Sequence, residues 1–76
     1  MISVETLNKC SKLDTAALQS LLRKHYPQDR VLTSKFVGIS NAQQFVYEIT
    51  FPYNGIPSKT KVFIDHFPNG ELVADY

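Results

Sequence analysis

The residue types that commonly carry catalysis are few in this 76-residue chain: two histidines, seven carboxylates and one cysteine. Asp65 and His66 are adjacent on a predicted strand, so their side chains leave opposite faces and cannot pair with each other. His25 falls on the leucine face of a predicted helix, where we interpret it as a boundary residue that packs its ring. Cys10 has no orienting partner at a spacing that indicates a catalytic triad, so we interpret it as structural. We therefore predict no catalytic residue and no enzymatic activity.

Sites for nucleotides, metals and other cofactors are also not indicated. The three glycines, Gly38, Gly55 and Gly70, are isolated beside turn residues, and none opens a helix as a phosphate-binding loop requires. A single cysteine can form neither a disulfide within the chain nor a zinc site built on cysteines. We predict no cofactor, no metal site and no small-molecule substrate.

The clearest structural element is a helix over residues 14–26. Asp14 is a good N-cap, because its carboxylate can accept from free backbone N–H groups of the first turn. Leu18, Leu21 and Leu22 lie on one face at helical spacing, and Pro27 ends the helix. The preceding residues 1–12 are either a short helix capped by Ser3 or an irregular arm, because so few residues are marginal for a helix.

From residue 30 onward the apolar period changes from helical to alternating, which is typical of strands. We expect strands at 30–39, 44–51, 59–67 and 71–75, a proline-bounded loop at 52–57 and a tight turn at 68–70. Because every connection is short, neighbouring strands should pair as an antiparallel meander. The prediction is one α+β domain over residues 1–76, with order α-β-β-β-β. One main N-terminal helix, with or without the short helix before it, packs on a four-stranded sheet over residues 30–76.

The last strands resemble PepSY domains in outline. The segments that carry the likeness are Tyr47-Glu48-Ile49, Val62-Phe63-Ile64-Asp65 and Asn69-Gly70-Glu71-Leu72-Val73. The resemblance covers only the C-terminal half and implies the same helix-then-meander order. We infer no function from it, since turn–strand endings of this kind occur in many unrelated sheets.

One group of apolar residues departs from the pattern of a sheet with a single buried face. If Val62 and Ile64 face the helix, alternation places Phe63, Val46 and Val73 on the other face. Charged side chains surround this stripe, as they surround many interfaces: Lys61, Glu48 and Asp65. The hypothesis is a small non-enzymatic protein-binding module of the adaptor or inhibitor type, acting by steric occupation of a partner. A homodimer is an open alternative for the partner, and small phage- or mobile-element-encoded proteins provide the class analogy.

Nucleic-acid binding is the alternative function. It would use a basic edge made by Arg23, Lys24, Arg30, Lys35, Lys59 and Lys61. The net charge is only +1, and the basic-aromatic signature of RNA-recognition sheets is missing. We therefore favour a protein partner over a nucleic acid.

The chain carries no pattern of an export signal or a membrane span. Its N-terminal residues lack an apolar core, and no apolar run exceeds three residues, whereas a span needs about 20. We expect a cytoplasmic protein without membrane contact.

Overall fold

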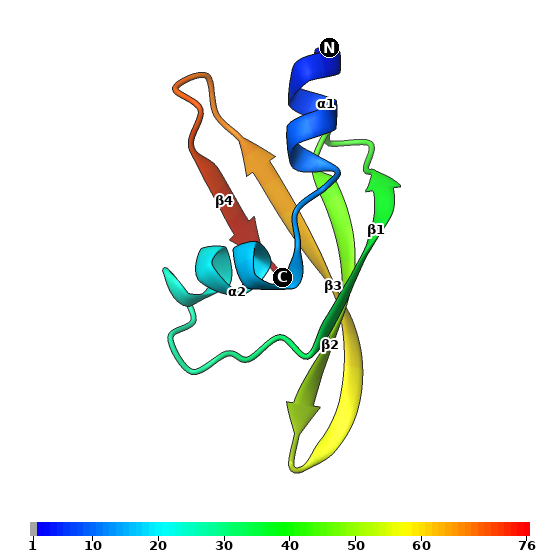
Figure 1. Ribbon diagram of the computed structural model, residues 1–76, viewed down its shortest axis with the longest axis vertical. Coiled ribbons are helices and arrows are strands. Elements are labelled where there is room, and N and C mark those ends of the chain that lie inside the picture. Colours follow the sequence, from blue (N-terminus) through cyan, green and yellow to red (C-terminus); the bar gives the residue numbers. More distant parts are fainter. Residues whose placement is uncertain (1) are drawn as a thin grey trace.

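The computed structural model describes residues 2–76, which form two helices followed by four strands. The helices are α1 (Val4–Cys10) and α2 (Thr15–Arg23), and the strands are β1 (Thr33–Ile39), β2 (Phe45–Tyr53), β3 (Ile56–His66) and β4 (Leu72–Asp75). The strands lie in the order β1-β2-β3-β4, and every neighbouring pair is antiparallel (Figure 1). The α+β class and the four-stranded meander are confirmed, and the short first helix is present.

Side-chain caps begin both helices. The hydroxyl of Ser3 accepts from the backbone N–H of Thr6 at 3.1 Å, and a carboxylate oxygen of Asp14 accepts from Ala17 at 2.8 Å. These bonds satisfy N–H groups that the first helical turn leaves free. The second helix ends at Arg23, earlier than the expected residue 26, because Pro27 prevents its continuation.

The predicted loop at 52–57 is wrong: β2 runs on to Tyr53 and β3 begins at Ile56. Asn54 and Gly55 have φ values of 51° and 78°, so they form the two-residue turn of a tight hairpin. The two prolines that suggested a loop, Pro52 and Pro57, lie opposite each other in the hairpin. At Pro52 and Pro57 neither β1 nor β4 pairs with the hairpin. The prolines, which lack an N–H group, therefore remove no hydrogen bond to a neighbouring strand.

This hairpin extends as an arm beyond both helices (Figure 1). Two apolar side chains at its tip, Tyr53 and Ile56, are exposed. The expected start of the first strand at residue 30 is also corrected, since β1 begins at Thr33. The residues before it are held by bonds to other elements: Val31 N–H donates to Gln19 Oε1 at 3.0 Å, and Leu32 N–H donates to the Thr50 carbonyl at 2.8 Å.

The hydrophobic core lies between the helices and one face of the sheet. The residues that form it are Cys10, Leu18, Leu22, Val31, Phe45, Tyr47, Ile49, Val62, Ile64 and Ala74. Each helix is too short to be stable alone, so its burial against the sheet is what keeps it folded. The other face of the sheet is consequently left without a covering layer.

Candidate functional site

The face of the sheet opposite the helices, which we call the open face, contains the residues that the sequence grouped together. Tyr47 pairs with Val62 in the core, so the next pair along the strands, Val46 and Phe63, points to the open face. By the same alternation Val73, which pairs with Asp65, also lies there. The register therefore brings Val46, Phe63 and Val73 onto one face.

The three apolar residues differ in how far solvent reaches them. Val46 is only 7% exposed, although neither helix covers it, whereas Phe63 and Val73 are half-buried. Neighbouring side chains of the same face must therefore bury Val46. It forms the floor of the open face, while Phe63 and Val73 remain accessible to a partner.

A shallow hollow of about 330 Å³ lies over Val46. The residues that line it are Val37, Gly38, Ile39, Ser40, Val46, Lys61 and Phe63. The register shifts between Phe36 and Gly38, so Val37 is an extra residue in β1 and the strand has a bulge there. Gly38 lies opposite Val46 and a Cβ built on it meets nothing within 4 Å, so the missing side chain leaves the space open.

Val37, which is 50% exposed, is a member of this hollow that the sequence reasoning missed. Alternation within the strand placed it on the open face together with Lys35, and that signal was available. The bulge could not be predicted from the sequence, because an isolated glycine in a strand is compatible with either a bulge or a turn.

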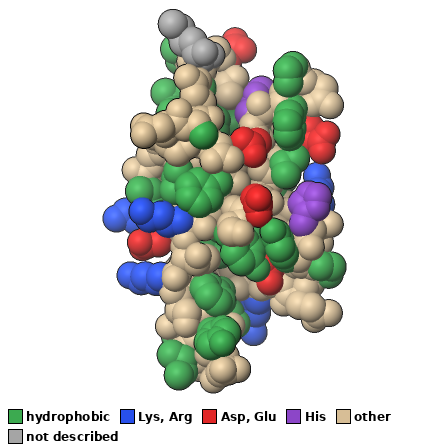
Figure 2. Space-filling view, turned by 180° about the vertical axis from the view of Figure 1, so that it is seen from behind, with side chains coloured by type: hydrophobic (Ala, Val, Ile, Leu, Met, Phe, Trp, Pro, Cys, Tyr) green, Lys and Arg blue, Asp and Glu red, His purple; other side chains and the backbone are tan. Residues whose placement is uncertain are grey.

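The charged residues of the open face lie on two sides of its apolar centre. Lys35, Glu48 and Lys61 form one row across three strands, and Lys59 makes an exposed ion pair of 3.8 Å with Glu48. On the other side of the centre, Asp65 accepts a hydrogen bond of 3.1 Å from Gln44. Viewed from behind in Figure 2, Lys and Arg side chains gather on the left edge at mid-height, with Asp and Glu mainly nearer the centre and right.

The six basic residues of the nucleic-acid alternative fall into two groups. Lys35, Lys59 and Lys61 are on the open face, whereas Arg23 and Lys24 stand at the end of α2 on the side of the helices. The sixth, Arg30, is in the connection from α2 to β1. Glu48 lies within the first group and reduces its positive potential.

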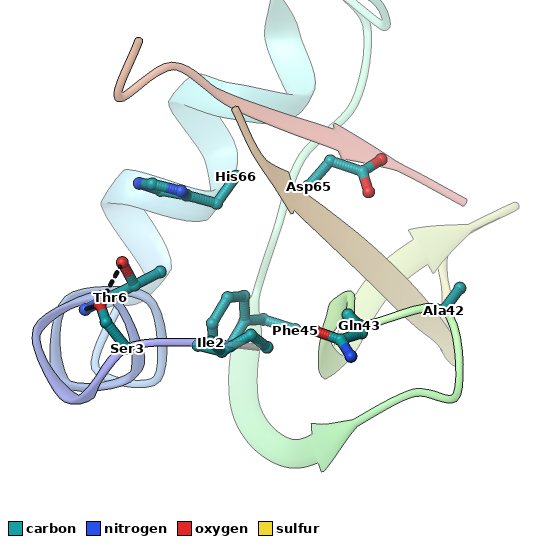
Figure 3. Close-up of a pocket in the computed structure, with 8 residues that line it drawn as sticks. All are labelled: Ile2, Ser3, Thr6, Ala42, Gln43, Phe45, Asp65 and His66. Atoms are coloured by element: carbon teal, nitrogen blue, oxygen red, sulfur yellow. Dashed lines mark hydrogen bonds between the residues drawn. The ribbon is translucent and has the colours of Figure 1, made fainter. Parts of the chain in front are cut away.

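A second hollow, of about 380 Å³, lies between α1, the β1–β2 connection and the end of β3 (Figure 3). Its hydroxyl groups bond to each other, since Ser3 donates to Thr6 at 3.0 Å. Figure 3 shows that His66 and Asp65 point in different directions from β3, as the alternation predicted. The hollow therefore does not bring a base and a carboxylate together.

The two other residues considered for chemistry, Cys10 and His25, lie in different environments. Cys10 lies in the core with no exposed surface, and burial raises the pKa of its thiol. His25 lies beyond the end of α2 and is exposed, with its ring 6.5 Å from that of Tyr26. The expected packing of His25 on the leucine face is wrong, because the helix stops two residues earlier.

Among residues 2–76, no group of three or more His, Cys, Asp or Glu side chains is placed to hold a metal ion. Within the same part of the chain, no helix has the length and apolar character needed to cross a membrane. The chain matches no protein-family model, no curated protein and no solved structure.

Proposed function

We propose that this chain is a protein-binding module whose contact surface is the open face. The observation that supports the proposal best is the hollow between Val37 and Phe63, with Val46 as its floor. It lies on a sheet face that no other element of residues 2–76 covers. An apolar centre within a charged border is the composition typical of protein interfaces.

The charges of the open face define the chemistry of its partner. The hollow accepts an apolar side chain, Lys35 and Lys61 attract acidic groups, and Asp65 attracts a basic group. A partner that presents an acidic group, an apolar side chain and a basic group in this order is complementary to the open face. Binding would act sterically, by occupying the surface that the partner presents.

Site-specific photo-crosslinking tests this proposal in cells. We place a photoreactive amino acid at Val37, on the edge of the hollow, and compare the chain with and without Phe63→Glu. Because a carboxylate at position 63 puts an uncompensated charge in the contact, we expect the adducts from position 37 to decrease at least tenfold. The mass of each adduct identifies the crosslinked species as another protein or a second copy.

A photoreactive residue at Val4 is the matched control. Val4 is 72% exposed and apolar, but it lies on α1 and not on the open face. Its adducts should be unaffected by Phe63→Glu. The proposed function would be overturned if position 37 gave no adducts, or if its adducts persisted unchanged with Phe63→Glu.

A further inference from the structure

The open-face side chains of β3 carry opposite charges on the two sides of one aromatic ring. Lys61 lies two residues before Phe63, and Asp65 lies two residues after it. A strand advances about 3.3 Å per residue, so the two charged side chains leave the strand about 7 Å on either side of Phe63. If the strand is laid over a reversed copy of itself, Phe63 meets Phe63 and each charge meets its opposite.

The neighbouring strand is compatible with the same reversal. Val46 lies beside the aromatic centre, Glu48 lies beside Lys61, and Gln44 donates to Asp65. After reversal Val46 meets Val46, and the amide of Gln44 meets the carboxylate of Glu48, which is a donor facing an acceptor. On β2 and β3 the apolar centre and its polar border are thus both self-complementary.

The carboxylate of Asp75 on β4 is the group that the reversal would bring near its own copy. It is held by two bonds of 2.7 Å, because it accepts from the hydroxyl of Tyr26 and from the backbone N–H of Tyr76. These donors stabilise its charge, and the pKa of Asp75 is lowered chiefly by the bond from Tyr26. The carboxylate of Asp75 therefore has its hydrogen-bond partners within one chain.

We propose that the open face binds a second copy of this chain across a twofold axis that crosses β3 at Phe63. The inference rests on the proposed function, because the same face makes the contact. In this arrangement Phe63 stacks on its counterpart, and Lys61 of each copy pairs with Asp65 of the other. The two sheets pack face to face about 10 Å apart with their strands within about 30° of one another, and the helices lie outside.

Two other symmetric arrangements bring like charges together. A twofold axis parallel to β3 would place Lys61 opposite Lys61 and Asp65 opposite Asp65. Pairing through the edge of β3 that β4 leaves free would use the segment around Lys59 and place that residue beside its own copy. The reversed face-to-face contact is the arrangement in which the charges of β3 attract.

Charge reversal tests the arrangement, with sedimentation equilibrium as the readout. We compare the wild type with Lys61→Asp, with Asp65→Lys and with an equimolar mixture of the two variants. Each reversal appears twice in a twofold dimer, so we expect each variant alone to self-associate at least tenfold more weakly. In the mixture, Asp at position 61 of one chain faces Lys at position 65 of the other, and heterodimers should form with near wild-type affinity. The control Lys12→Asp, exposed and away from the open face, should leave self-association unchanged.

The mixture keeps the test decisive even if one variant is less stable, because recovery on mixing requires folded chains and the proposed pairing. If the wild type, both variants and their mixture all sediment alike, the second-copy proposal is overturned. Failure of the mixture to recover, with both variants shown folded by circular dichroism, would overturn the reversed arrangement. A monomeric wild type that still gives adducts with another protein, lost on Phe63→Glu, would overturn this inference and leave the proposed function in place.

Discussion

The hydroxyl of Tyr47 accepts a hydrogen bond of 3.0 Å from the backbone N–H of Leu13. Tyr47 stands on β2 at the centre of the sheet, and the same hydroxyl donates to the carbonyl of Cys10. The connection between α1 and α2 is thereby attached to the sheet at one buried point. These bonds hold the connection on the core face of the sheet, opposite the open face.

Tyr47→Phe should lower the free energy of unfolding by about 1–3 kcal/mol, because it leaves the backbone groups of residues 10 and 13 without their partner. Denaturant unfolding followed by circular dichroism measures the change. Tyr53→Phe is the control, since Tyr53 is exposed on the arm, and its effect should stay within about 0.5 kcal/mol. Equal stability of Tyr47→Phe and wild type would show that these bonds contribute nothing.

Cys10 should react with thiol reagents only after the protein unfolds. Its side chain has no exposed surface, and burial raises the pKa of the thiol, so little thiolate is available in the folded state. Labelling with an aromatic disulfide reagent in buffer and in denaturant measures the difference. We expect a rate at least a hundredfold lower in buffer, and rapid labelling of the folded protein would contradict the burial of Cys10.

The C-terminal strand should loosen in alkali. Tyr76 donates its hydroxyl to Asp29, and this bond is the main cause that raises the pKa of Tyr76 from 10.0 to about 12. A pKa raised on folding gives a stabilisation that is complete below pH 10 and is lost as the pH rises through about 12. The difference in unfolding free energy between wild type and Tyr76→Phe should therefore shrink across this range. A difference that is constant with pH would contradict the bond.

Local signals were sufficient to predict α2 and the two faces of the sheet, whereas they left residues 1–12 as either a short helix or an irregular arm. Asp14 and Pro27 each act on the adjacent backbone, so the approximate limits of α2 follow from residue type. Alternation likewise separates Val46 and Phe63 from Tyr47, because a strand has a period of two.

Features that depend on contacts distant in sequence could not be predicted. Prolines 52 and 57 indicated a loop, and only the end of the neighbouring strands explains why a hairpin tolerates them there. The low exposure of Val46 depends on side chains from several strands, and the bond from Tyr26 to Asp75 joins residues 49 positions apart. No local pattern distinguishes these contacts from ordinary surface residues.

The most direct test of the open face as an interface is the solution mass of the wild type, of Phe63→Glu and of Tyr53→Glu. Tyr53 is an exposed aromatic residue on the arm and does not line the hollow, so it is the matched control. Sedimentation equilibrium should give wild type and Tyr53→Glu about twice the chain mass of 8.6 kDa at high concentration, and Phe63→Glu the mass of one chain. A Phe63→Glu variant with the same mass as the wild type, whether that is one chain or two, would contradict self-association through this face.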